Sequence, residues 1–424
     1  MTSVTGKTDA VPNRLRMILI LGALVALTPL TIDTYLPALP DVSEDLSASG
    51  SMVQLTLTAT LFGLAGGQIV MGALSDAWGR RLPLLLGTAL HVLASALVAV
   101  APSVEVLAVL RLLQGVGASA SAVIGLAIVR DIYTGRAAAV ALSRLMLIMG
   151  AFPILAPTLG GVLLNWVSWR GVFLVLAAYG FVMLAIVTAG LPETLPAEER
   201  RSARLGATAR TFGQLLKDRM FVGLVLVAGL TMGALFSYIA GAAYVYQDQF
   251  GMSQQTFGLA FGAGAVWLAV GSQLNPVLLR WFEPVQVMSW AIAAGAVAGL
   301  LLAVTAMTGF GGLPAVLAGV WAVMLACSLV QPNAPALALS RYGEAAGTAA
   351  ALLGSLQFGI GAVAAPLVGL LGNDAAAMGL SMFGAITLAG LALLIVVRPW
   401  TLSAADDTDT RTADIADAQS QPAG

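Results

Sequence analysis

One acidic residue and one arginine lie inside stretches of sequence that are otherwise almost entirely apolar. Asp33 falls in LTPLTIDTYLPALP, residues 27–40, and Arg111 falls in RLLQGVGASA, residues 111–120. If both stretches are membrane-spanning helices, Asp33 lies about 24 Å along its helix from Met17, near the outer boundary of the bilayer. Arg111 lies about 10 Å inward from that same boundary, counted from Val104, so the depths of the two residues overlap. A carboxyl group in this position binds or releases a proton according to the water and the cations that reach it. We therefore expect Asp33 to accept a proton and Arg111 to be its electrostatic partner.

Gln114 follows Arg111 by one helical turn and can share the same polar network. Two simpler roles remain open for the charged pair. Asp33 could merely reach the outer interface of a membrane, and Arg111 could tie its helix to backbone carbonyls. Ionisable residues inside a membrane usually mark functional sites, which favours the proton-coupling interpretation.

The composition places these residues in a membrane protein. Hydrophobic residues make up 59% of the 424-residue chain, charged residues 10%, and the mean hydropathy is +0.92. A soluble domain has about 25% charged residues. Runs of about 20 apolar residues, which suffice to cross a bilayer as a helix, occur from end to end, and the alternating polarity of a β-barrel is absent from the sequence. The fold class is therefore an all-α integral membrane bundle.

Clusters of charge, proline and glycine divide the chain into twelve predicted transmembrane helices. The predicted spans are 17–37, 52–74, 82–101, 104–128, 138–162, 170–190, 220–246, 256–279, 286–308, 314–338, 345–370 and 376–397. The domain organisation is a tail at 1–16, a six-helix half at 17–190, a cytoplasmic linker at 191–219, a second six-helix half at 220–398 and a disordered tail at 399–424. The linker has room for a surface helix.

Basic residues fall in alternate loops. With a cytoplasmic N-terminus, 17 of the 20 basic residues lie in inner segments, and Arg111, Arg144 and Arg170 are the exceptions. The positive-inside rule then places both termini in the cytoplasm. A weak repeat supports the two halves, since APTLGG at 156–161 recurs as APLVG at 365–369. Duplicated halves are typical of secondary transporters.

Two further motifs are suited to gating. The loop GALSDAWGRR, residues 72–81, contains glycines for close backbone approach and charges that can pair with neighbouring helix ends. Its gate residues are Gly72, Asp76, Gly79, Arg80 and Arg81, with Arg130 and Asp131 as partners. An ordinary charged loop is the alternative.

The fifth span contains GAFPILAPTLGG, residues 150–161. Pro153 and Pro157 remove backbone donors, while Gly150, Gly160 and Gly161 permit close packing, which suits a hinge or a tight contact between the halves. A merely kinked structural helix is the alternative.

These motifs resemble the major facilitator superfamily, whose signature in this loop is G-x-L-[AS]-D-x-x-G-R-[RK]. The sequence departs from it at Ala77, where the family usually has Arg. The stretch at 111–120 resembles the fourth-helix motif, whose Arg is associated with proton coupling. The stretch at 150–161 resembles the fifth-helix motif of the drug/proton antiporter branch, with Ala156 where Gly is commoner.

Together with DTYLPALP, NWVSWRGVF and GTAAALLGSLQF, these motifs make nearly the whole chain similar to Bcr/CflA-type multidrug exporters. The resemblance implies an antiporter that exports amphipathic antibiotics from the cytoplasm across a bacterial inner membrane in exchange for protons, by alternating access. We expect the protein to be a monomer. Bicyclomycin-like, phenicol or sulfonamide compounds are the implied substrates. A transporter of an endogenous metabolite is the alternative, and a membrane enzyme or sensor is a third.

For substrate contact we expect apolar rings with a few polar groups, which suit a promiscuous pocket. The candidates are Tyr35, Phe236, Tyr238, Gln357 and Phe358, each of which could equally be a packing residue. His91, the only histidine, is expected to be structural. No metal-ligand spacing and no P-loop occur in the sequence, so we expect no cofactor, metal, ATP or nucleic acid.

Overall fold

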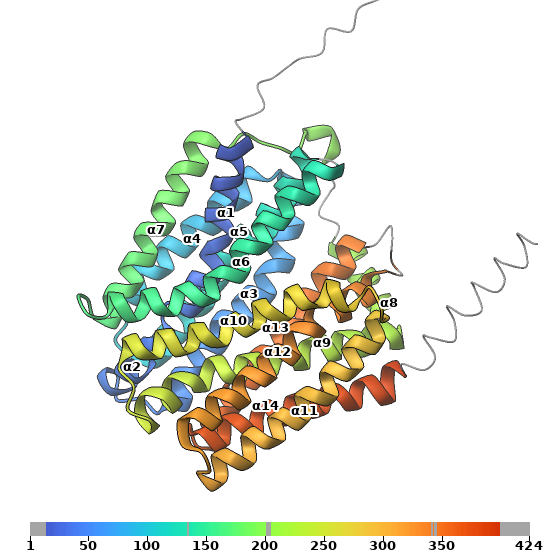
Figure 1. Ribbon diagram of the computed structural model, residues 1–424. Coiled ribbons are helices and arrows are strands. Elements are labelled where there is room, and N and C mark those ends of the chain that lie inside the picture. The colour runs from blue at the N-terminus through green and yellow to red at the C-terminus, as the bar shows by residue number, and fades with distance from the viewer. Residues whose placement is uncertain (1–13, 134, 201–204, 341, 343–345, 399–424) are drawn as a thin grey trace, which may run out of the picture. The chain divides into compact units, whose positions relative to one another are not determined.

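Helices account for nearly all of the residues that the structure describes (Figure 1). The structure is a computed structural model, and it describes residues 14–133, 135–200, 205–340, 342 and 346–398. No strand occurs in these ranges.

The first set of helices precedes the linker. Their bounds are α1 Arg14–Asp33, α2 Leu39–Asp45, α3 Gly50–Trp78, α4 Arg81–Val98, α5 Val104–Ile132, α6 Gly135–Leu163 and α7 Trp169–Gly190. A short 3₁₀ turn, Leu36–Ala38, separates α1 from α2. Between α7 and α9, a 3₁₀ turn at Ala197–Glu199 precedes the short helix α8, Leu205–Leu215.

The second set follows the linker. Its members are α9 Arg219–Ala243, α10 Gln254–Leu278, α11 Pro284–Thr308, α12 Gly312–Leu339, α13 Ala346–Leu371 and α14 Ala375–Leu391. Short π-helical segments, Tyr244–Gln249 and Ala392–Val397, continue α9 and α14.

The predicted all-α membrane fold is confirmed, and every predicted span contains a helix. Within the described residues, 11 helices are long and apolar enough to cross a membrane. The 29-residue α6 occupies the remaining predicted span, the fifth. The first helix ends at Asp33, earlier than the predicted 37, and Pro37, which has no N–H to donate, lies in the 3₁₀ turn that follows.

The chain divides into two compact units. Unit 1 comprises Met1–Leu205 and Tyr246–Gly262, and unit 2 comprises Gly206–Val245 and Ala263–Gly424. The segment Tyr246–Gly262 belongs to unit 1 although it follows the linker in sequence. Its side chains and backbone are bonded there, for example Gln254 Nε2 to Asp41 at 2.7 Å and Thr158 Oγ1 to the carbonyl oxygen of Gly258 at 3.1 Å.

In unit 1, α3 and α5 pack closely enough for their backbones to touch. A Cβ atom on Gly63 would lie 2.1 Å from the carbonyl oxygen of Leu112, and one on Gly115 would lie 2.2 Å from that of Thr60. Small residues at such crossings drive helix association in membranes because apolar burial gives little advantage there. The pair fixes the height of α5, and therefore of Arg111, beside its neighbours.

In unit 2, an aspartate caps the N-terminus of α9 and another caps that of α14. Asp218 Oδ1 accepts from the backbone N–H groups of Met220 and Phe221, and Asp374 Oδ1 accepts from that of Ala377. These caps satisfy donors that the helix cannot pair itself.

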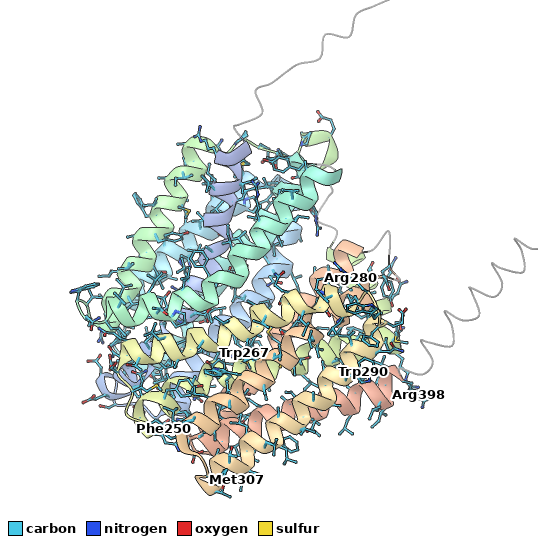
Figure 2. All side chains as sticks on the ribbon, in the orientation of Figure 1. Phe250, Trp267, Arg280, Trp290, Met307 and Arg398 are labelled. Carbon is cyan, nitrogen blue, oxygen red and sulfur yellow. The ribbon has the colours of Figure 1, made fainter. Side chains whose placement is uncertain are left out.

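Large apolar side chains remain on the outer face of unit 2. Trp290 and Met307, labelled in Figure 2, have exposed fractions of 54% and 65%. Exposed rings and aliphatic chains on long apolar helices suit contact with lipid.

The contact between α3 and α5 gives a test by substitution. In Gly63→Ala, the added methyl group meets a backbone carbonyl that cannot move aside, and overpacking of this kind costs about 1–3 kcal/mol. We expect a lower midpoint of thermal unfolding in detergent. Gly66→Ala is the matched control on the same helix, because a Cβ atom there has nothing within 4 Å. Equal midpoints for the two variants would contradict the close approach.

Candidate functional site

Arg111 of α5 lies at the centre of a buried polar cluster in unit 1. Its side chain is fully buried. Nη1 donates to the carbonyl oxygen of Thr31 at 2.9 Å and to Oε1 of Gln114 at 2.6 Å. The rings of Tyr35 and Phe173 lie against the guanidinium, with centroids 4.9 and 5.4 Å from Cζ. Such contacts stabilise a desolvated cation by about 2 kcal/mol.

The carbonyl group that receives Arg111 belongs to the last turn of α1. That helix ends at Asp33, so the carbonyl of Thr31 is one of the four that have no partner within the helix. The C-terminal end of a helix also carries partial negative charge, which attracts a cation. Arg111 therefore caps α1 and fixes the turn on which Asp33 lies.

Asp33 itself is only 4% exposed. Among the described residues, no ion pair within 4.0 Å joins it to Arg111. The expected direct pair is therefore not formed in this structure. Arg111 instead makes the tie to a backbone carbonyl that the sequence left open. The guanidinium keeps two buried nitrogens, Nε and Nη2, without a hydrogen-bond partner among the described residues.

Tyr35 belongs to this cluster. Its ring is fully buried and contacts both Arg111 and the ring of Phe173, and its hydroxyl lies 3.2 Å from Oγ1 of Thr56. Tyr35, which the sequence predicted for substrate contact, thus holds the guanidinium of Arg111 in place. Gln114 lies beside Arg111 as the helical spacing predicts, and its amide continues to Ser95 of α4 at 2.7 Å.

The charged loop between α3 and α4 forms a second cluster around Arg80. Nε of Arg80 donates to Asp131 Oδ2 at 2.8 Å, and Nη1 donates to Asp76 Oδ1 and, at 3.0 Å, to Ser75 Oγ. The side chains of Arg80 and Asp131 are 10% and 15% exposed. In this burial the pair differs from most ion pairs on protein surfaces, which contribute little to stability.

Glu193, at the start of the linker, completes the cluster. Its carboxylate accepts the backbone N–H groups of Arg80 at 2.8 Å and Arg81 at 3.2 Å, where α4 begins. It also accepts from the N–H groups of Thr194 and Leu195, both at 3.0 Å. Burial alone would raise the pKa of Glu193, but these bonds to its charged form outweigh burial and lower the pKa. An anion at a helix N-terminus is also favoured by the helix dipole.

The remaining residues predicted for this gate motif differ in their surroundings. Gly79 has a φ of +91° and lies so close to Glu193 that a Cβ atom would be 2.3 Å from the carboxylate. A Cβ atom on Gly72 would make only an ordinary contact at 3.6 Å. Arg81 Nη2 donates to the carbonyl oxygen of Thr188 at 2.6 Å. Arg130 is exposed and forms no ion pair among the described residues, so it is not part of the cluster.

The fifth-span motif lies in α6, which is helical through Gly150, Pro153 and Pro157. The side-chain surroundings of residues 150 and 153 lie outside the described part of the structure. A Cβ atom on Gly160 would be 2.1 Å from the carbonyl oxygen of Thr34. One on Gly161 would be 2.5 Å from that of Gln254. The motif's last glycines therefore bring α6 against the chain just after α1 and the start of α10.

The other substrate candidates all belong to unit 2. Phe236 and Phe358 are in ring contact, with centroids 6.1 Å apart. Gln357 Nε2 donates to Oε1 of Gln331 at 2.6 Å. Tyr238 is 2% exposed, and its hydroxyl lies 2.9 Å from where a Cβ atom on Gly264 would be. The sequence did not single out Gln331, since one amide in an apolar helix carries no motif.

The sequence of the chain matches one family of known proteins over most of its length. Residues 21–366 match the Major Facilitator Superfamily. The chain belongs to the Major Facilitator Superfamily. It is a multi-pass membrane transporter, and the expected resemblance to the drug-efflux branch is confirmed by its relatives.

Three relatives of this Major Facilitator Superfamily chain span most of its length. An uncharacterised MFS-type transporter, YdgK of Bacillus subtilis, is 38% identical over 90% of this chain and 95% of its own. A bicyclomycin resistance protein homologue of Haemophilus influenzae is 32% identical over 87% and 92%. A chloramphenicol resistance protein of Pseudomonas aeruginosa is 32% identical over 79% of each chain.

Solved structures agree with the fold of the superfamily. A mutant form of the nucleoside transporter NupG has a TM-score of 0.72 at 13% identity and covers 91% of this chain and 100% of its own. The xylose transporter XylE from E. coli has a TM-score of 0.68 at 12% identity, covering 90% and 97%. At these identities the likeness concerns the fold alone.

Two positions depart from the superfamily signatures. Ala77 replaces the usual Arg, yet Arg80 still meets two carboxylates and a serine hydroxyl, so the cluster forms without a charge at residue 77. Ala156 is fully buried, so the extra methyl group relative to Gly is accommodated within α6.

The lowered pKa of Glu193 predicts a pH-dependent contribution to stability. A carboxylate whose folded pKa is depressed stabilises above its ordinary value, 4.5, and loses that effect as the pH falls through the lower folded pKa. Glu193→Gln should lower the midpoint of thermal unfolding at pH 7, and the difference from wild type should shrink below pH 4.5. Glu198→Gln, at an exposed linker position, is the control. A difference between wild type and Glu193→Gln that does not change with pH would refute this role.

Proposed function

We propose that this chain is a proton-coupled antiporter that exports amphipathic antibiotics from the cytoplasm. The observation that carries the proposal is the buried guanidinium of Arg111, which has two unmet donors and no anionic partner among the described residues. A charge without a counter-charge inside a membrane costs free energy, so such residues usually have a role in function. Asp33, on the turn that Arg111 caps, supplies a titratable group.

In this proposal a proton and Arg111 compete for Asp33. When Asp33 is ionised, a modest shift of α1 would let its carboxylate occupy the free Nε and Nη2 groups of Arg111. A proton that enters from outside would neutralise Asp33 and return the guanidinium to the carbonyl of Thr31, the arrangement observed. Drug binding and proton binding would then exclude each other. The tie between α1 and α5 would change with each cycle of alternating access.

The orientation in the membrane is proposed from the charges of unit 2 and from the alternation of basic loops in the sequence. In unit 2, Arg280 and Arg398 lie at one end of the helices and Met307 lies at the other (Figure 2). Arg219 Nε donates to the carbonyl of Val396 at 3.1 Å, so it lies at the same end as Arg398. By the positive-inside rule this end faces the cytoplasm. We therefore place the C-terminal end of the chain there, and the alternation of basic loops in the sequence puts the N-terminus in the cytoplasm as well. The proposed location is a bacterial inner membrane, with the monomer as the working unit.

The substrate class is proposed from the unit 2 candidates and from the relatives. Paired rings and a bonded pair of amides are side-chain types that suit a neutral or weakly polar aromatic drug. Relatives named for resistance to bicyclomycin and chloramphenicol support antibiotics as the cargo.

To test the proposal, wild type and Asp33→Asn are expressed in a bacterium that lacks its own drug exporters, and its susceptibility to a panel of antibiotics is measured. We expect wild type to protect against some compounds and Asp33→Asn to lose most of that protection, because Asn cannot exchange a proton. Glu105→Gln, which removes an exposed carboxylate, is the control at matched membrane abundance.

Other outcomes would revise the proposal. Protection by both wild type and Asp33→Asn would leave export intact but move coupling away from Asp33. Protection by neither would favour transport of an endogenous metabolite.

A further inference from the structure

A line of buried side chains leads away from Arg111 toward α4. Gln114 Oε1 accepts from Arg111 at 2.6 Å, and Gln114 Nε2 donates to Ser95 Oγ at 2.7 Å. Ser95 Oγ donates to the carbonyl oxygen of His91 at 2.7 Å and lies 3.4 Å from Nε2 of His91. All four side chains are fully buried. Water therefore cannot substitute for a lost partner.

The hydroxyl of Ser95 has a single proton to give. Since that proton goes to the backbone carbonyl one turn earlier, the oxygen of Ser95 can meet Gln114 only as an acceptor. The ring of His91, at its longer distance, is the one other side chain recorded beside this oxygen.

Because Ser95 accepts a hydrogen bond from Gln114, it determines which end of the Gln114 amide faces α4. A glutamine amide has an oxygen at one end and an NH₂ group at the other, and its two orientations differ little in shape. Because Ser95 requires the NH₂ group, the oxygen is turned toward Arg111. In the reversed orientation two donors, the NH₂ group and the guanidinium, would face each other.

The oxygen of Gln114 is the only side-chain acceptor that the structure records for Arg111, whose other bond is to a backbone carbonyl. A hydrogen bond to a charged group is stronger than one between neutral groups, so the loss of this acceptor weighs heavily on the guanidinium. The position of the guanidinium therefore depends on an amide whose orientation is set on another helix.

We propose that Ser95 is a positioning residue for Arg111. It acts through Gln114 by fixing which end of that amide faces the guanidinium, and the main-chain carbonyl of His91 fixes Ser95 in turn. The geometric part of the proposal stands on the bonds above. Its effect on transport rests on the proposed antiporter function.

The test compares Ser95→Ala with Thr88→Ala. Thr88 lies on the same helix, is fully buried, and bonds the carbonyl of Leu84 at 2.8 Å just as Ser95 bonds that of His91. The two variants each lose one buried hydroxyl, but only Ser95→Ala removes a partner of Gln114.

The readout is the guanidinium NMR signal of Arg111 in full-length protein labelled at arginine, assigned by its loss in Arg111→Lys. We expect Ser95→Ala to shift or broaden this signal and Thr88→Ala to leave it unchanged. An unchanged signal in Ser95→Ala, or equal changes in both variants, would overturn the proposal.

A second comparison tests whether Ser95 acts on Arg111 through Gln114. Gln114→Glu has an acceptor oxygen at both ends, so the orientation of the group no longer depends on Ser95. Adding Ser95→Ala to Gln114→Glu should leave the Arg111 signal where Gln114→Glu alone places it. A further shift in the double variant would contradict the positioning role, since additivity fails only for coupled sites.

Transport assays then separate the two proposals. In vesicles that contain the purified protein, Ser95→Ala should lower kcat for an exported antibiotic about tenfold, with KM little changed. This is the effect expected when the Gln114 amide turns and its bond to the guanidinium of Arg111 is lost. If wild type transports no drug, the antiporter proposal fails, while the NMR comparison still decides whether Ser95 positions Arg111. A normal kcat in Ser95→Ala with a shifted signal would overturn the link to transport.

Discussion

The arrangement of unit 1 depends on keeping one guanidinium charge stable out of reach of water. Arg111 achieves this without a carboxylate: a free carbonyl at the end of α1, one amide oxygen and two aromatic rings share the charge. Each of these groups comes from a different position along the chain, so the packing of α1, α3, α4, α5 and α7 must bring them to the same depth. The glycines that let α3 and α5 touch serve this requirement, because a wider separation would move Tyr35 and its partner Thr56 away from Arg111.

In the cluster around Arg80, unlike that around Arg111, positive and negative charges are paired. Arg80 is paired with carboxylates from two elements, and Glu193 ties the start of the linker to the first turn of α4. Here the charges are compensated, partly buried and near the aqueous end of the helices. This cluster is suited to fixing one arrangement of the loop, whereas the uncompensated Arg111 is suited to changing partners.

The sequence predicted the fold well because each membrane-spanning helix is encoded locally. Charge, proline and glycine mark its ends, and the apolar run sets its length. The same local logic placed Gln114 beside Arg111, and motif spacing brought Asp76, Arg80 and Asp131 to one cluster. The direct contact between Asp33 and Arg111 did not follow, because overlap in depth does not determine which side of a helix a residue faces. Ser95, Glu193 and Gln331 were missed for a related reason: each acts through a partner distant in sequence. The spacing of His91 and Ser95, four residues apart on one helix, was the only local signal for the first of them.

The central claim is that the buried site in unit 1 couples drug movement to protons. The most direct measurement uses purified protein in sealed vesicles with an interior more acidic than the medium, and follows a labelled neutral antibiotic to which the chain gives protection. We predict accumulation above the external concentration, loss of that accumulation when an ionophore dissipates the pH gradient, and none in Arg111→Gln. Accumulation that persists without the gradient, or that is undiminished in Arg111→Gln, would contradict the account.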